Sequence, residues 1–168
     1  MIGDRWGVRE EEVAREYPCD RFVDRPALRA WRGVTIETPA ERVWPWVMQI
    51  RVAPYAYDWI DNGFRRSPQR LVELSEPQVG EAFTTAAGRK RGRIMAVEQG
   101  VQLTGRIMGG YLSYVLVPES PDRTRLLLKV VMQVNPLVAV GLSLGDLVMA
   151  RRQLLNLKRL AELPEAPR

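Results

Sequence analysis

TRLLLKVVMQV, residues Thr124–Val134, is followed closely by VGLSLGDLVMARRQLLNLKRLAEL, residues Val140–Leu163, and these two segments determine the architecture. In the first segment apolar residues recur at every second position. One face carries Leu126, Leu128, Val130, Met132 and Val134, and the other is interrupted by Arg125, Lys129 and Gln133. This period is typical of a half-buried antiparallel strand, so we expect one face in the core and the other in water.

The second segment has the period of an amphipathic helix. Its apolar sector contains Val140, Leu144, Leu147, Val148, Leu154, Leu155 and Leu157, and the opposite sector contains Arg152, Gln153, Asn156 and Arg159. At about 3.3 Å per strand residue and about 1.5 Å per helical residue, both elements are on the order of 35 Å long. A sheet of such strands could therefore wrap the helix along its whole length.

Upstream of this pair, the chain predicts one strand, one helix and a run of short strands. The strand is expected at Leu28–Glu37. The helix after it should begin with Thr38 as N-cap, Pro39 at the first helical position and Glu41 completing a capping box. Its expected buried face is Val43, Trp46, Val47 and Ile50. Further strands, forming an antiparallel meander, are expected at Ala82–Ala86, Arg93–Glu98, Val101–Met108, Tyr111–Pro118 and Thr124–Val134.

The length of 168 residues and the hydrophobic content of 46% favour one domain with a single core. We place this domain at residues 28–163, with a leader at residues 1–27 packed on it and a tail at residues 164–168. The leader has a helical pattern at Val8–Glu16 that ends at the Tyr17-Pro18 step, because a residue before proline disfavours the helical conformation. It should pack Trp6 and Tyr17 on the outside of the domain.

The composition excludes several classes of function. The sequence has no histidine and the single cysteine Cys19, which removes the usual metal ligands, the usual general base and any internal disulfide. We expect no metal, no cofactor and a reduced, cytoplasmic setting. The first twelve residues mix acids and bases where a signal peptide would be apolar, and the apolar window at Leu137–Leu144 is far shorter than the about 20 residues of a membrane span.

A net charge of +5 makes anionic partners worth weighing, but only one group of basic residues is clustered. This group lies between and beside two glycines and consists of Arg89, Lys90, Arg91 and Arg93. This segment is interpreted first as a solvated hairpin turn and second as an anion-contacting patch. We expect no nucleic-acid partner.

Several motifs resemble one family of bacterial, mostly actinobacterial, proteins within the START-like, or SRPBCC, superfamily. They are Trp6-Gly7, Glu12 to Arg15, Tyr17 to Asp20, Ala30 to Val34, Pro39 to Trp46, Arg51 to Asn62 and Arg151 to Lys158. The resemblance covers nearly the whole chain. It implies an α+β helix-grip fold, in which a curved antiparallel sheet of about six or seven strands surrounds the long C-terminal helix.

The same resemblance implies an internal, mostly apolar cavity that takes a hydrophobic small molecule. The superfamily includes polyketide cyclases and aromatases, lipid and hormone binders, ubiquinone-binding proteins and co-chaperones. Three functions therefore stay open: cyclase or dehydratase proton-transfer chemistry on a polyketide-like ligand, a non-catalytic carrier or sensor of lipids or metabolites, and a co-chaperone-like interaction module. The resemblance also leaves a homodimer open.

The candidate site centres on the polar and aromatic cluster at Tyr55–Asn62, which the resemblance implies lies near one mouth of the cavity. Asp58 is the candidate general base, because burial beside aromatic rings would raise the pKa of a carboxyl group. Tyr57 is the candidate hydrogen-bond donor at the reacting atoms. In the competing structural interpretation, Asp58 and Asp61 cap a short helix and the aromatic side chains pack.

The remaining candidate ligand-binding residues come from several predicted elements. Arg51 or Arg106 would anchor an acidic end of the ligand, and Tyr114 would donate a second hydrogen bond. The full candidate binding set is Trp46, Arg51, Tyr55, Trp59, Asp61, Arg106, Tyr114, Leu147 and Arg151. Arg151 and Lys158 fall in the apolar helix sector, and we expect them either to extend to its rim or to meet an acidic group or an anionic ligand.

One serine motif is set aside on chemical grounds. Gly141-Leu142-Ser143-Leu144-Gly145 matches the nucleophile-elbow pattern, but a serine nucleophile there needs a histidine base. We therefore interpret the motif as small residues at the start of the helix.

Overall fold

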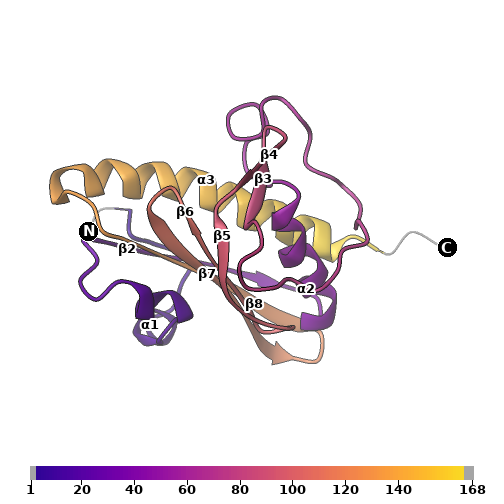
Figure 1. Cartoon of the computed structure of the whole chain (residues 1–168). Helices are drawn as coiled ribbons and strands as arrows, with labels where there is room; N and C mark the ends of the chain where they lie inside the picture. The colour runs from indigo at the N-terminus through magenta and orange to yellow at the C-terminus, as the bar shows by residue number, and fades with distance from the viewer. Residues whose placement is uncertain (1–2, 165–168) are drawn as a thin grey trace.

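The computed structural model describes residues 3–164, with only the backbone described for residues 136–140 and 142. A six-stranded sheet has the strand order β1-β2-β8-β7-β6-β5, antiparallel except for the parallel pair β1–β2. These strands are β1 (Arg5–Trp6), β2 (Leu28–Ile36), β5 (Arg93–Glu98), β6 (Gln102–Ile107), β7 (Gly110–Ser120) and β8 (Arg123–Met132). The helix α3 (Pro136–Glu162) lies along one face of the sheet (Figure 1). The predicted α+β fold class is confirmed.

Shorter elements complete the chain: α1 (Glu10–Ala14), η1 (Pro18–Phe22), α2 (Ala40–Met48), η2 (Gln49–Arg51), β3 (Thr84–Ala86) and β4 (Arg89–Arg91). The strands agree with their predicted positions within a few residues. Two strands are additions: β1, which pairs with β2, and β4, which pairs with β3 in a separate hairpin at the basic turn. The strand predicted at Ala82–Ala86 therefore lies outside the main sheet, not in its meander. Its three basic residues are all exposed, as expected of a solvated turn. Of the expected tail, residues 165–168 lie outside the described residues.

The main core lies between the sheet, α2 and α3. The predicted buried face of α2 is confirmed, because Val43, Trp46, Val47 and Ile50 are all buried in one cluster. The predicted cap is wrong. The helix begins at Ala40 with Pro39 at the N-cap position, and the Thr38 hydroxyl makes no capping hydrogen bond to the first turn. It instead donates to the carbonyl of Ala161, 3.3 Å away at the end of α3.

The second face of β8 is covered by the leader, which corrects the expectation that this face lies in water. Arg125 and Lys129 are buried there, and each is neutralised by an acid from the leader. The Arg125 guanidinium donates to both carboxylate oxygens of Glu12 at 2.7 Å, and the Lys129 ammonium lies 2.7 Å from Asp20. Charged side chains can be buried when paired in this way.

A second apolar cluster accompanies these ion pairs under the leader. It contains Tyr17, Cys19, Val115, Leu127 and Val131. Figure 1 shows α1 on the side of the sheet away from α3, so the strands at the centre of the sheet are covered on both faces. Trp6 is half-buried and packs against the main core.

The buried stripe of α3 differs from the predicted sector. Leu154 and Leu157 are buried as predicted, but Leu144, Val148 and Leu155 are exposed. The other buried residues of the helix are Ser143, Ala150, Gln153, Leu160 and Ala161. Gln153 can be buried because its amide is satisfied: its oxygen accepts from the Tyr114 hydroxyl at 2.5 Å, and its nitrogen donates to the Pro54 carbonyl at 2.5 Å. The helix also starts earlier than predicted, and the side chain of Val140 lies outside the described residues.

Among the described residues, we find no helix with the length and apolar character needed to cross a bilayer.

Candidate functional site

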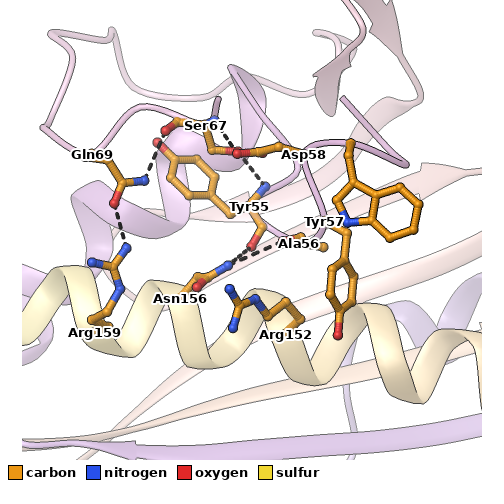
Figure 2. A pocket seen from close by; sticks show the side chains of 10 residues that line it. Tyr55, Ala56, Tyr57, Asp58, Ser67, Gln69, Arg152, Asn156 and Arg159 are labelled. Carbon is orange, nitrogen blue, oxygen red and sulfur yellow. Dashed lines mark hydrogen bonds between the residues drawn. The ribbon is translucent and has the colours of Figure 1, made fainter. Parts of the chain in front are cut away.

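The connection between η2 and β3 folds over α3 and leaves an open cleft of about 420 Å³ between them (Figure 2). Tyr55 anchors this connection. Its side chain is buried, and its hydroxyl accepts a hydrogen bond from the Gln49 amide at 2.6 Å. Its carbonyl accepts from the Asn156 amide of α3 at 2.8 Å. Burial raises the pKa of the Tyr55 hydroxyl above its ordinary value, so it stays neutral.

A closed loop begins immediately after Tyr55. The Asp58 carboxylate accepts from the Ser67 backbone N–H at 2.9 Å and from the Ser67 hydroxyl at 2.5 Å, which ties the two ends of the loop together. Asp61 accepts from the backbone N–H of Tyr57 at 3.3 Å. Burial raises the pKa of Asp61. Both carboxylates thus bind groups of the loop itself, and these described residues contain no helix for Asp58 and Asp61 to cap.

The other wall of the cleft is a polar stripe on α3. Arg152, Asn156 and Arg159 follow one another at intervals of four and three residues, which places them on one side of a helix. The Arg152 guanidinium lies 5.8 Å from the centre of the Tyr57 ring, and the Arg159 guanidinium donates to the Gln69 amide oxygen at 2.6 Å. Within the described part of the chain, neither arginine has an ion-pair partner. The sequence pattern places these residues only in the sector opposite the apolar one.

Aromatic side chains close one end of the cleft. Trp59 packs edge-on against Tyr57 with 6.5 Å between ring centres, and 61% of its surface is exposed. Figure 2 shows the Tyr57 ring standing beside α3 next to Arg152. The cleft therefore combines guanidinium donors with exposed aromatic surface.

Four of the predicted site residues line this cleft together, namely Tyr55, Tyr57, Asp58 and Trp59, and Asp61 lies in the same loop. The others lie elsewhere in the described structure. Trp46 and Tyr114 are buried in the main core, where the Tyr114 ring lies 6.3 Å from that of Phe83. Burial raises the pKa of the Tyr114 hydroxyl. The cleft lies on the connection side of α3, away from both residues.

The predicted arginines have local partners. Arg51 lies 3.2 Å from Glu81 and donates to the Ser75 carbonyl. Arg106 is exposed and stacks over the Tyr111 ring at 5.7 Å, and Arg151 is exposed over the Trp6 ring at 5.3 Å. Leu147 is half-buried on α3.

Lys158 reaches an acidic group, which was one of the expected outcomes for the cations in the helix sector. Its ammonium donates to Glu162 at 2.5 Å and to the Thr35 carbonyl at 2.7 Å. Ser143, the serine of the elbow-like motif, is buried inside α3, and its carbonyl accepts from Arg32 at 3.3 Å. In residues 3–164 we find no group of three or more cysteine or acidic side chains that could hold a metal ion.

Comparisons with known proteins show the fold. A crystal structure of a protein from Rhodobacter sphaeroides is similar over 82% of this chain and 95% of its own, with 19% identity and a TM-score of 0.52. One from Mesorhizobium loti is similar over 79% and 95%, with 16% identity and a TM-score of 0.52. A solution structure of an AHSA1-like protein from Aeromonas hydrophila is similar over 79% and 92%, with 18% identity and a TM-score of 0.47.

No protein-family model matches the chain, and the search of curated proteins finds no match. A sheet with a long C-terminal helix along one face is consistent with the helix-grip fold that the resemblance implies.

Proposed function

We propose that the cleft between the connection and α3 binds a small anionic molecule with an aromatic or other apolar body, and that the protein is a carrier or sensor of it. The observation that carries this proposal is Arg152, whose guanidinium is exposed over the Tyr57 ring without an ion pair among the described residues. A carboxylate or similar acid group would accept charge-assisted hydrogen bonds there. The rings of Tyr57 and Trp59 offer apolar surface to the rest of the ligand.

The proposal keeps the acidic end that we expected of the ligand and changes the residues that anchor it. Arg51 is already paired with Glu81, whereas Arg152 and Arg159 border the cleft. It also favours binding without turnover. The Asp58 carboxylate accepts two hydrogen bonds from Ser67 and so shapes the loop, which leaves it poorly placed to take a proton from a ligand.

Ligand-observed NMR on matched pairs of probes tests the proposal. Each pair consists of an aromatic or medium-chain carboxylate and its primary amide, which has nearly the same shape without the charge. We expect the acid of a pair to bind and the amide not to bind. Arg152→Gln should weaken binding of the acid on the order of tenfold or more, since a hydrogen bond to a charged group is lost. Arg29→Gln, an exposed arginine outside the cleft, is the matched control.

Two results would refute this function. Equal binding of acid and amide would mean that the protein does not detect the charge. Loss of binding in Arg106→Gln, with binding unchanged in Arg152→Gln, would place the ligand site on the surface around Tyr111.

A further inference from the structure

Two loops beside the cleft form one continuous surface that shares only Trp59 with the cleft lining. We call it the double-loop surface and define it as residues 59–66 and 87–91. The loops are joined by a hydrogen bond from the Ala87 backbone N–H to the Asn62 side-chain oxygen at 3.1 Å. Gly63 is so close to Ala87 that a side chain added to it would lie 3.1 Å from the Ala87 β-carbon. Figure 1 shows the β3–β4 hairpin and the connection side by side, on the side of α3 away from the sheet.

Large apolar side chains are exposed at the tip of the first loop. Phe64 is 81% exposed, and Ile60 and Trp59 are both more than half exposed. The backbone holds Phe64 outward in a defined turn, because its N–H donates to the Asp58 carbonyl at 2.8 Å and its φ is 64°. A bulky residue with positive φ costs energy, and here the turn presents an apolar ring to solvent.

Basic side chains surround these apolar tips. Arg65 and Arg66 follow Phe64 directly, and Arg89, Lys90 and Arg91 come from the adjacent hairpin; all five are exposed. The Arg65 guanidinium lies over Gly88, which ties the basic residues of the two loops together. The one acid in the two segments, Asp61, is half-buried and turned toward the Tyr57 backbone. The surface therefore carries strong positive charge around an apolar centre.

We infer that the double-loop surface docks on anionic lipid membranes. Protruding Ile and Phe side chains gain free energy when they enter the boundary between headgroups and acyl chains, and arginine and lysine attract anionic headgroups at the same depth. This combination distinguishes a membrane from nucleic acid. A single-stranded nucleic acid would engage the basic residues and could stack bases on Phe64 or Trp59, but it would leave the aliphatic Ile60 without an apolar partner.

Docking in this way would place the mouth of the cleft at the membrane, since Trp59 belongs to both the double-loop surface and the cleft wall. The inference goes beyond the proposed function and does not depend on it, because vesicle binding requires no ligand in the cleft.

Co-sedimentation with vesicles tests the inference. One set of vesicles is phosphatidylcholine alone, and the other is equal parts phosphatidylcholine and phosphatidylglycerol. We expect binding to the anionic set only, and weaker binding at about 1 M salt than at about 0.1 M, because the screening length falls from about 10 Å to about 3 Å. Ile60→Ser combined with Phe64→Ser should reduce affinity on the order of tenfold or more. Arg89→Gln combined with Arg91→Gln should reduce it about fivefold per residue.

Matched controls change the same chemistry elsewhere. Met108→Ser removes an apolar side chain that is 90% exposed at the β6–β7 turn, and Arg25→Gln combined with Arg29→Gln removes two exposed charges in and before β2. Both should bind vesicles like the unchanged protein. Phe64→Trp supplies an independent readout, because its fluorescence should shift to the blue on anionic vesicles.

Three outcomes would overturn the inference: no binding to anionic vesicles, equal loss in the controls, or unchanged binding by the Ile60→Ser and Phe64→Ser variant. Tighter binding to single-stranded RNA than to anionic vesicles at the same salt would assign the surface to nucleic acid instead.

Discussion

The ion pair between Glu12 of α1 and Arg125 of β8 gives the sharpest stability prediction. Arg125 is 5% exposed, and its guanidinium donates to both Glu12 oxygens at 2.7 Å, to the Gly7 carbonyl at 2.7 Å and to the Thr35 hydroxyl at 3.1 Å. Glu12→Gln keeps the shape and one acceptor oxygen but removes the counter-charge. Breaking a buried pair in this way costs about 3–5 kcal/mol. Three neutral acceptors remain, namely the amide oxygen, the Gly7 carbonyl and the Thr35 hydroxyl, so we expect the low end, about 3 kcal/mol.

The control lies on the same helix. Glu10 pairs with Arg5 at 2.9 Å, but Glu10 is 86% exposed, so Glu10→Gln should change the free energy of unfolding by less than about 1 kcal/mol. Urea unfolding followed by tryptophan fluorescence measures both variants. With a slope of about 1–3 kcal/mol per molar urea, Glu12→Gln should lower the midpoint by about 1–3 M. If the two variants unfold at the same midpoint, the leader is not a cooperative layer of the fold.

Three further predictions concern the same stability measurements. Burial raises the pKa of Glu12, but hydrogen bonds from Arg125 and from the Arg9 backbone outweigh it, so the pKa is lowered. The contribution of Glu12 to the free energy of unfolding is therefore full above its unfolded pKa and should disappear as pH falls below about 4. A difference in stability between the unchanged protein and Glu12→Gln that stays constant over this range would contradict the assignment. Tyr114→Phe leaves the buried Gln153 oxygen without its donor and should cost about 1–3 kcal/mol in thermal unfolding; an unchanged melting temperature would rule out that hydrogen bond. A side chain added at Gly145 or at Gly100 meets only open space, but Gly145 is helical whereas Gly100 has φ of 74°. Gly145→Ala should therefore stabilise the protein by about 1 kcal/mol, and Gly100→Ala should destabilise it. Stability changes of the same sign in the two variants would refute the backbone argument.

The fold was largely predictable because its elements carry strong local patterns. The alternation in β8 and the period of α3 are properties of a few neighbouring residues, and so are the hairpin turns of the meander. What the patterns could not show was which polar residues are buried. Arg125 and Lys129 look the same in the sequence whether they face water or face Glu12 and Asp20 from more than a hundred residues away.

In the candidate site, too, the local part was predictable from the sequence and the long-range part was not. Tyr55, Tyr57, Asp58 and Trp59 are neighbours in the sequence and could be grouped from it. Arg152 joins them only through the packing of the connection on α3. Gln153 shows the same limit, since the hydroxyl of Tyr114 and the carbonyl of Pro54 that allow its burial are distant in the chain.

The way β8 is enclosed has a consequence for the order of folding. Glu12 and Arg125 are 113 residues apart, Asp20 and Lys129 are 109 apart, and β2 pairs with β8 across its whole length. During synthesis the leader and β2 emerge long before the strand that they enclose. Such distant contacts slow folding, because the entropy of closing a long loop must be lost before the contacts form. Until β8 leaves the ribosome, the two-residue strand β1 is the only main-sheet neighbour that β2 has among the described residues, so nascent chains that stop before residue 123 should remain protease-sensitive and chaperone-bound.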